Sequence, residues 1–320
     1  MIKFKVVLLI VFAVSLITNL WLLFGYKLKG NPQIVHNLFS AEEKKYPLIS
    51  KRVLLEYPND LLINFLPLRQ KLRQVIGGYN EKENTFAMYF EYLPTGTSIG
   101  IMEKTDFTAA SLFKIPIIMA YYHKKERLDM KEDPVVTIQE EDLDRDFGTL
   151  WQKGVGTEIN IDEAVRRAII DSDNTAIKLI SKQIEKEDFD AVYAGLDIDL
   201  MLQEDTVVIN AKQFSSLLKA LYFSSLLNKE NSQKILDLMT KTRFHDKLPA
   251  GVPASVPVAH KIGTLITENK MFMDCGIVYV PRRPYLLCMI SVTDEKTARE
   301  RMKTISKEVY TYVTTSVAPK

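Results

Sequence analysis

The sequence predicts an α+β fold: an antiparallel sheet flanked by terminal helices, with an inserted all-helical part, preceded by a transmembrane helix. Three observations support this expectation. Segments rich in β-branched and aromatic residues lie towards both ends of the chain. Helical patterns fill the region between them, and a long uncharged apolar run precedes everything else. The order sheet, helices, sheet, helix indicates one sheet whose two halves are separated by the helical insertion.

Residues 1–29 are predicted to be an N-terminal membrane anchor. Val6 to Tyr26 is an uncharged run of 21 residues, long enough to cross the hydrocarbon core as an anchor or to serve as a signal peptide. No small-x-small cleavage pattern follows it and no cysteine is placed to accept a lipid, which favours an uncleaved anchor. We therefore expect a single-pass protein of the cell membrane, with the bulk of the chain on the extracytoplasmic side.

The rest of the chain divides into a lead-in and one large domain. Residues 30–58 are polar and contain three prolines, which is typical of a stalk. Residues 59–320 form the large domain, with a sheet part at 59–105 and 255–320 and a helical part at 106–254. With 47% hydrophobic residues in the chain, such a domain can bury a substantial core.

The charge, histidines and cysteines of the chain limit the kinds of partner and cofactor that it could use. The formal net charge is +2, but the first 29 residues hold four lysines and no acidic residue, so everything after them carries −2. No basic patch is implied, which argues against nucleic acid as a partner. The four histidines show no metal-ligand spacing, and no metal or other cofactor is expected. Cys275 and Cys288 are either buried thiols or a bridge, and we favour thiols.

The sheet part begins with an amphipathic helix that is capped by Asn59 and ends near Ile76, where two glycines follow. Thr85–Leu93 and Ser98–Lys104 have the pattern of a β-hairpin. A G-x-S-x-G match is centred on Ser98. A nucleophile elbow needs a helix directly after the serine, whereas a strand follows here, so we interpret the glycines as turn residues.

The sheet is completed near the C-terminus. Val258–Ile266 is an extended segment, and Asp274–Val280 and Tyr285–Thr293 predict an antiparallel hairpin. A final helix, from about Glu295 to Tyr312, has apolar positions spaced to lie on the sheet.

The helical part begins with apolar residues from Leu112 to Tyr122, which predict a helix buried on every side. Four further helices are expected, at 161–170, 175–187, 211–227 and 232–241. Tyr193 to Asn210 is interpreted as a short connection.

Ser111 and Lys114 stand where the buried helix begins. Residues three apart share one face of a helix, so the hydroxyl and the amine can meet there. Burial disfavours the charged form of a lysine, and an amine biased towards neutrality can take the proton of a serine hydroxyl. Free backbone N–H groups at a helix start suit a developing oxyanion. The alternative is a serine that caps the helix and a lysine that extends to solvent.

Two further polar motifs follow. Ser172-Asp173-Asn174 lies between two apolar helices, 61 residues after Ser111, and taken alone could be a tight turn with a cap for the second helix. Lys261 and Gly263 lie two residues apart on an extended segment near the C-terminus.

Together, in this order and in these elements, the motifs resemble those of the penicillin-recognising serine hydrolases, and their spacing is most similar to the class A β-lactamase branch. The resemblance covers roughly residues 40 to 315. It implies a β-lactamase/transpeptidase-like fold and makes the domain at 59–320 the catalytic one. It also implies a small-molecule β-lactam or a peptidoglycan peptide as substrate.

The resemblance implies a catalytic role for four residues. Ser111 would be the nucleophile that becomes acylated, and Lys114 the base or base-assisting group beside it. Ser172 would pass a proton to the departing nitrogen. Lys261 would place positive charge near Ser172 and the substrate carboxylate, and its charge would help to keep Lys114 neutral.

The resemblance assigns substrate binding to three more residues, Asn174, Gly263 and Thr264. Asn174 would hold the side-chain amide of the substrate, whereas Asp173 would be a structural support. Gly263 lets the strand lie close to the ligand, and the N–H groups of Ser111 and Thr264 would form the oxyanion hole.

Two departures from the family pattern limit what the resemblance implies. Ile262 stands where a serine or threonine is usual, and Thr264 could only partly replace that hydroxyl. Class A enzymes also carry a glutamate, closely followed by an asparagine, that activates the deacylating water. Here Glu204 lies six residues before Asn210, which does not fit, although Glu204 or Asp205 could still position a water. Slow deacylation is therefore expected.

Three functions remain open. The first is a membrane-anchored β-lactamase-like hydrolase that forms an acyl-enzyme on Ser111. The second is a D-alanyl-D-alanine carboxypeptidase or transpeptidase acting on peptidoglycan. The third is a tethered, non-catalytic binding or sensor domain, for which Ile262 is the main support.

Overall fold

The structure is a computed structural model that describes residues 45–49, 62–80, 84–198, 201–203, 206–267 and 270–316. The chain divides into two units, Met1–Pro47 and Leu48–Lys320, and all elements discussed below belong to the second. The expected membrane anchor lies outside the described residues. Within the described ranges, no helix combines the length and the apolar character needed to cross a bilayer.

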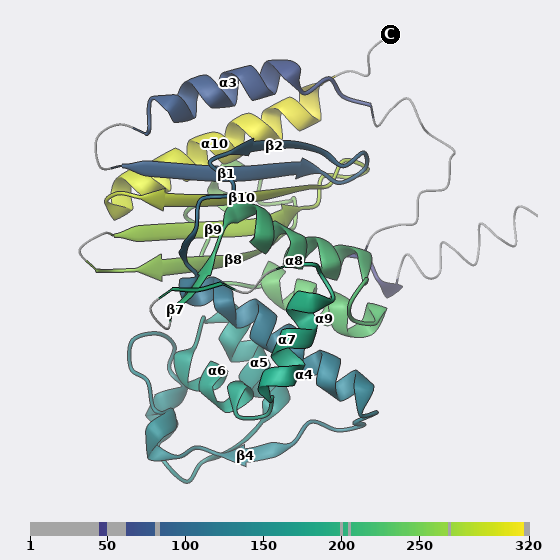
Figure 1. Ribbon diagram of the computed structural model, residues 1–320, viewed down its shortest axis with the longest axis vertical. Helices are drawn as coiled ribbons and strands as arrows, with labels where there is room; N and C mark the ends of the chain where they lie inside the picture. Colours follow the sequence, from purple (N-terminus) through teal and green to yellow (C-terminus); the bar gives the residue numbers. More distant parts are fainter. Residues whose placement is uncertain are drawn as a thin grey trace, which may run out of the picture. The chain divides into compact units, whose positions relative to one another are not determined.

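A five-stranded antiparallel sheet organises the second unit, with strand order β2-β1-β10-β9-β8 (Figure 1). The strands are β1 Thr85–Tyr92, β2 Thr97–Ile101, β8 Val258–Leu265, β9 Met271–Val278 and β10 Tyr285–Val292. β1 pairs with β10, which comes from the other end of the chain. The expectation of one antiparallel sheet, interrupted by a helical insertion, is thereby confirmed.

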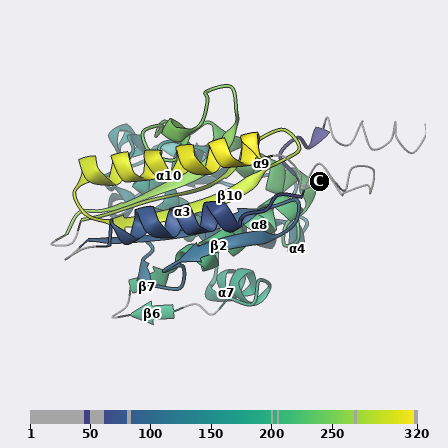
Figure 2. The ribbon, with the colours of Figure 1, turned by 90° about the horizontal axis from the view of Figure 1, so that it is seen from above.

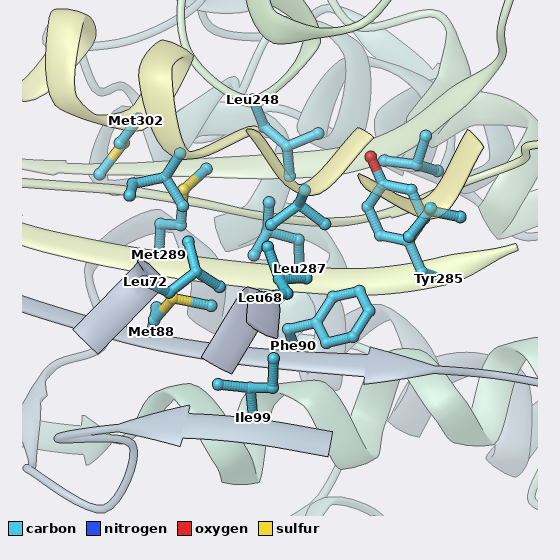
Figure 3. Close-up of a cluster of buried hydrophobic side chains, with 14 of the residues drawn as sticks. Leu68, Leu72, Met88, Phe90, Ile99, Leu248, Tyr285, Leu287, Met289 and Met302 are labelled. Carbon is cyan, nitrogen blue, oxygen red and sulfur yellow. The ribbon is translucent and has the colours of Figure 1, made fainter. Parts of the chain in front are cut away.

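The two terminal helices cover one face of this sheet. Helices α3, Leu66–Gly77, and α10, Glu295–Thr315, lie side by side on it (Figure 2). Between them and the strands, fully buried side chains of α3, β1, β10 and α10 form a continuous apolar core (Figure 3). Each large apolar side chain in it contributes roughly 1.5–3 kcal/mol to folding by leaving water. Helix α8, Ala211–Phe223, packs on β1, β9 and β10.

The start of α3 differs from the expectation. The helix was expected from Asn59, but residues 62–65 are not helical and α3 begins at Leu66. Pro67 occupies the first turn, where its missing N–H and fixed φ are tolerated, and Leu66 N donates to Asn64 Oδ1 at 3.0 Å where the helix begins. Asn59, the expected cap, lies outside the described residues.

The helical part begins with a short 3-10 turn, η1 Ala110–Phe113, which continues directly into α4, Lys114–Arg127. Every residue of α4 from Lys114 to Tyr122 is buried, as expected for a helix surrounded by others. The remaining long helices are α5 Ile161–Ile170, α6 Asn174–Ser181, α7 Lys186–Ala194 and α9 Lys229–Thr240. Short 3-10 turns are η2 Glu140–Asp142, η3 Leu150–Lys153 and η4 Pro249–Gly251.

The expected helix at 175–187 is wrong in its extent, because the chain forms two helices there. Helix α6 ends at Ser181, and α7 begins after Glu185, whose side chain pairs with the backbone N–H of Asp188 in a reciprocal capping box. A local cap thus outweighs the continuous helical pattern of the sequence.

Small strands connect the helices. The segment Tyr193 to Asn210, expected to be a simple connection, contains a hairpin of β6 Met201–Gln203 and β7 Thr206–Ile209. Strand β7 pairs with β3, Phe107–Thr108, just before η1. A second pair joins β4, Val135–Thr137, to β5, Glu158–Asn160.

The expectation of free thiols is wrong: Cys275 and Cys288 form a disulfide with an S–S distance of 2.04 Å. The register of β9 and β10 places the two residues directly opposite each other, with Cα atoms 3.9 Å apart. Both are fully buried. Neighbouring strands therefore bring the two sulfur atoms together without any help from distant contacts.

Removing this bridge should destabilise the fold. For a closed loop of 13 residues, the loss of the constraint on the unfolded chain is worth roughly 3 kcal/mol. We expect the Cys275→Ala/Cys288→Ala variant to unfold at lower denaturant concentration than the wild type. Thiol titration of the denatured, unreduced wild type should detect no free thiol, and detection of two would contradict the bridge.

Candidate active site

Ser111 lies in η1, immediately before α4. The turn is anchored by Leu112, which is fully buried, and its first residue, Ala110, has a positive φ of 44°. Strand β8 packs against the turn. A Cβ at Gly263 would lie 3.1 Å from Met273 Sδ and 3.4 Å from Leu112 Cγ, so glycine lets this strand approach the turn closely. Ser111 itself is half-buried, one helical turn before Lys114.

Lys114 points into the protein and is only 5% exposed. Its Nζ donates hydrogen bonds to the carbonyl oxygen of Ser172, to Ser172 Oγ at 3.2 Å and to Asn174 Oδ1 at 2.6 Å. The lysine therefore does not extend to solvent, as the alternative interpretation of Ser111 and Lys114 required.

Burial lowers the pKa of Lys114 to about 8, and the negative charges of Asp173 and Asp144 oppose this effect. Desolvation is the larger effect because the ammonium has left water without a carboxylate in direct contact. At neutral pH a measurable fraction of this amine is therefore unprotonated and can accept a proton.

Ser172 connects the two lysines of the site. It is fully buried, with a positive φ of 56°, and its Oγ receives a hydrogen bond from Lys261 Nζ at 2.8 Å in addition to that from Lys114. Lys261 is 1% exposed, and its pKa is lowered well below the usual value by burial and by the nearby charge of Lys114, against a weaker opposing effect of Asp274. Two buried amines on one hydroxyl disfavour simultaneous protonation.

Asp173 supports the site without facing it. Its carboxylate caps α6 by accepting from Ala176 N at 3.0 Å, and it also accepts from the backbone N–H groups of Thr149 and Leu150, each at 2.8 Å. A Cβ at Gly148, whose φ is 86°, would lie 2.1 Å from Asp173 Oδ2. Glycine is required there because the carboxylate lies against the loop backbone.

Asp173→Ala should destabilise the fold by roughly 2–4 kcal/mol, because three backbone N–H groups lose their acceptor. Chemical denaturation measures this change. The control is Asp237→Ala, which removes a half-exposed carboxylate from an ion pair within one helix and should change stability by less than about 0.5 kcal/mol. Similar effects of the two substitutions would contradict the supporting role of Asp173.

Sequence reasoning missed Asp144, which completes the hydrogen-bond chain of the site. Asn174 accepts from Lys114 through Oδ1 and donates to Asp144 Oδ1 through Nδ2 at 3.0 Å. Asp144 lies in the acidic loop between η2 and η3. The only signal in the sequence is the acidic character of that loop, which does not single out one of its carboxylates.

The structure thus brings Lys114, Ser172, Asn174 and Lys261 into direct contact and places Ser111 in the adjoining turn. Gly263 and the half-buried Thr264 follow Lys261 on β8, while Ile262 is buried.

Asn210 caps α8 by accepting from Gln213 N, and its Nδ2 donates to Asp106. Glu204 and Asp205 lie outside the described residues. Across the described part of the chain, no group of three or more acidic, histidine or cysteine side chains could hold a metal ion.

Comparison with known proteins gives a match along most of the chain. The model of the beta-lactamase enzyme family matches residues 67–313. Among solved structures, PBP-A shares the fold at 22% identity with a TM-score of 0.69, covering 77% of this chain and 95% of that one. A β-lactamase from Sphaerobacter thermophilus DSM 20745 shares it at 18% identity with a TM-score of 0.71, covering 79% and 98%. A mutant of PBP-A has been solved as an acyl-enzyme complex with penicillin G, and its structure matches at 21% identity with a TM-score of 0.69, covering 77% and 95%.

Proposed function

The chain belongs to the beta-lactamase enzyme family and is a serine hydrolase of the β-lactamase and penicillin-binding type, and we propose that it forms an acyl-enzyme on Ser111 with β-lactam or related amide substrates. The observation that supports this proposal is the buried contact of Lys114 and Lys261 with one hydroxyl, that of Ser172. Among the described residues neither amine donates to a carboxylate, and two buried amines that share a hydroxyl suit proton transfer better than stability.

Acylation would begin with the neutral amine of Lys114. It takes the proton of Ser111 Oγ while that oxygen attacks the substrate carbonyl. The N–H groups of Ser111 and Thr264 stabilise the negative charge that develops on the carbonyl oxygen. The proton then moves from Lys114 through Ser172 Oγ, which lies 3.2 Å from Lys114 Nζ, to the departing nitrogen, and the C–N bond breaks.

Lys261 would be the group that recognises the carboxylate of the substrate. An anion placed beside this buried amine raises its pKa and favours its positively charged form. That charge in turn favours loss of the proton from Lys114, because both amines share Ser172. Substrate binding and activation of the base would therefore be coupled through electrostatics. With Ile262 in the motif, the hydroxyl contact to the same carboxylate would come from Thr264 alone.

Release of the acyl group is proposed to be slow. The asparagine that would accompany a deacylating glutamate, Asn210, is occupied as the cap of α8. Glu204 and Asp205 precede it at a spacing that differs from the pattern of class A enzymes.

The second candidate is a D-alanyl-D-alanine carboxypeptidase or transpeptidase that acts on peptidoglycan. Slow release from β-lactams fits such an enzyme, whose natural acyl acceptor is water or an amine. The fold that the chain shares with PBP-A is compatible with this candidate, just as the fold that it shares with β-lactamases is compatible with the first. For either function, we propose that Val6 to Tyr26 anchors the protein in the cell membrane with its active site on the extracytoplasmic side.

One experiment separates these functions from a non-catalytic tethered domain. The full-length chain is incubated with a chromogenic β-lactam while turnover and intact mass are recorded. Sustained turnover indicates a β-lactamase. A long-lived adduct, absent from Ser111→Ala, indicates a penicillin-binding enzyme. Absence of both indicates a binding or sensor domain and would refute the proposed acylation.

A further inference from the structure

We propose that Asp144 is a positioning residue for acylation: its carboxylate holds the Asn174 side chain in the one orientation that leaves the lone pair of Lys114 free for Ser111. The inference rests on the proposed function and adds a residue to its site. Asp144 lies 30 residues before Asn174 in the chain, and Asn174 Nδ2 reaches its Oδ1 at 3.0 Å.

The argument begins with the two ends of the Asn174 amide. Oδ1 accepts from Lys114 Nζ at 2.6 Å, and Nδ2 donates to Asp144 Oδ1. A carboxylate can only accept hydrogen bonds, so it selects the orientation that turns Nδ2 towards Asp144. A rotated amide would place its oxygen against the carboxylate, where the two oxygen atoms repel each other.

This selection matters most when Lys114 has lost its proton. A neutral amine has a lone pair that can accept a hydrogen bond, and a rotated Asn174 would offer it the donor Nδ2–H. That bond would occupy the lone pair that has to take the proton of Ser111. By retaining Nδ2, Asp144 keeps Lys114 available as a base.

Asp144 is itself held in place by α6. The hydroxyl of Thr175, which is fully buried, accepts from Asp144 N at 3.0 Å and donates to its carbonyl oxygen at 3.3 Å. Asp146 N donates to Asp144 Oδ1 at 3.1 Å, and Lys178 Nζ lies 3.4 Å from Oδ2. Because Asp173, Asn174 and Thr175 each bond the same loop, the carboxylate is fixed relative to the helix that carries Asn174.

The charges around Lys114 make the proposal measurable as a pH dependence. Asp173, at the start of α6, and Asp144, from the loop, both favour the ammonium form, whereas Lys261 on β8 disfavours it. Removing the charge of Asp144 should therefore lower the pKa of Lys114. The acylation rate, which requires the neutral amine, should then rise at lower pH than in the wild type.

Three variants of the full-length chain test this inference. Asp144→Asn keeps an oxygen that Asp146 N orients towards Asn174 but removes the charge. Asp144→Ala removes both the acceptor and the charge. Asp146→Asn removes the same charge from an exposed neighbour on the same loop and is the matched control. The rate of penicillin G acylation is followed by intact mass across a series of pH values.

We expect the rising limb of the pH profile to move to lower pH in both Asp144 variants and to stay in place in Asp146→Asn. The plateau rate should fall roughly tenfold in Asp144→Ala, the cost of losing one orienting hydrogen bond, and much less in Asp144→Asn. A wild-type plateau in Asp144→Ala would overturn the proposal. Equal plateau losses in both variants without a shifted limb would also overturn it, because they would indicate a merely structural residue.

Failure of penicillin G to acylate the wild type would contradict the proposed function but not the role of Asp144. A second measurement therefore tests that role without acylation. The pKa of Lys114 is read from its ¹³Cε resonance in lysine-labelled protein, assigned by its loss in Lys114→Arg. A lower pKa in both Asp144 variants than in the wild type and Asp146→Asn would support the link between Asp144 and Lys114. An unchanged pKa would overturn it.

Discussion

Ser111→Ala is expected to abolish the covalent adduct with penicillin G and to lower any β-lactam turnover by a factor on the order of 10³ or more. Removal of the nucleophile leaves only the substrate-binding and oxyanion-stabilising groups, and losses of this size or larger follow when a serine nucleophile is deleted. The fold should be unaffected, because Ser111 is half-buried and Leu112 anchors the turn. Intact mass and turnover measure the first two effects, and thermal unfolding measures the third.

Ser98→Ala is the matched control. Ser98 is the other serine that a sequence motif singled out, and it lies in β2 at the sheet edge, followed by strand rather than helix. This variant should keep both the adduct and the turnover of the wild type. Loss of the adduct in Ser98→Ala, with retention in Ser111→Ala, would reverse the assignment of the nucleophile.

The main features of the site could be predicted because they depend on local structure. Ser111 and Lys114 are three residues apart in one helical segment, and the strand that carries Lys261 has strong β-forming residues around it. The hairpins of the sheet were predictable for the same reason, whereas the pairing of β1 with β10 joins the two ends of the domain. Their convergence on Ser172 depends on the tertiary fold and could be expected only through the family resemblance.

The features that were missed have two different causes. The loop around Asp144 contains several carboxylates, and only long-range hydrogen bonds from Thr175 determine which of them meets Asn174. No local pattern encodes that choice. The disulfide, by contrast, had a local signal, because Cys275 and Cys288 lie equally far from the turn between β9 and β10. An antiparallel hairpin places such residues opposite each other, and applying this register would have favoured the bridge over free thiols.

Lys114→Met should lower the acylation rate by about 10²–10⁴-fold, the range that a positioned general base contributes. In the wild type, the rate should rise with pH and level off above about 8, the pKa to which burial lowers this amine. In the variant, the residual rate should lose this rising limb. Acylation followed by intact mass at several pH values tests both effects. A limb of unchanged position and size in Lys114→Met would show that another group is the base.

The same substitution should change how stability depends on pH, because the lysine is protonated more readily in the unfolded chain than in the fold. Between a pKa of about 8 in the fold and the ordinary value of 10.5, the unfolded state binds more protons, so the wild type gains stability as the pH rises. The gain over this window is on the order of 3 kcal/mol, since each pKa unit corresponds to about 1.4 kcal/mol. Lys114→Met lacks this contribution. The free energy of unfolding of the wild type, relative to that of the variant, should therefore increase as the pH rises, and urea unfolding curves measure this difference. If the free energies of unfolding of the two proteins depend on pH in the same way from pH 8 to 10.5, the pKa of Lys114 is not lowered by burial. The amine would then be protonated near neutral pH and could not act as the base.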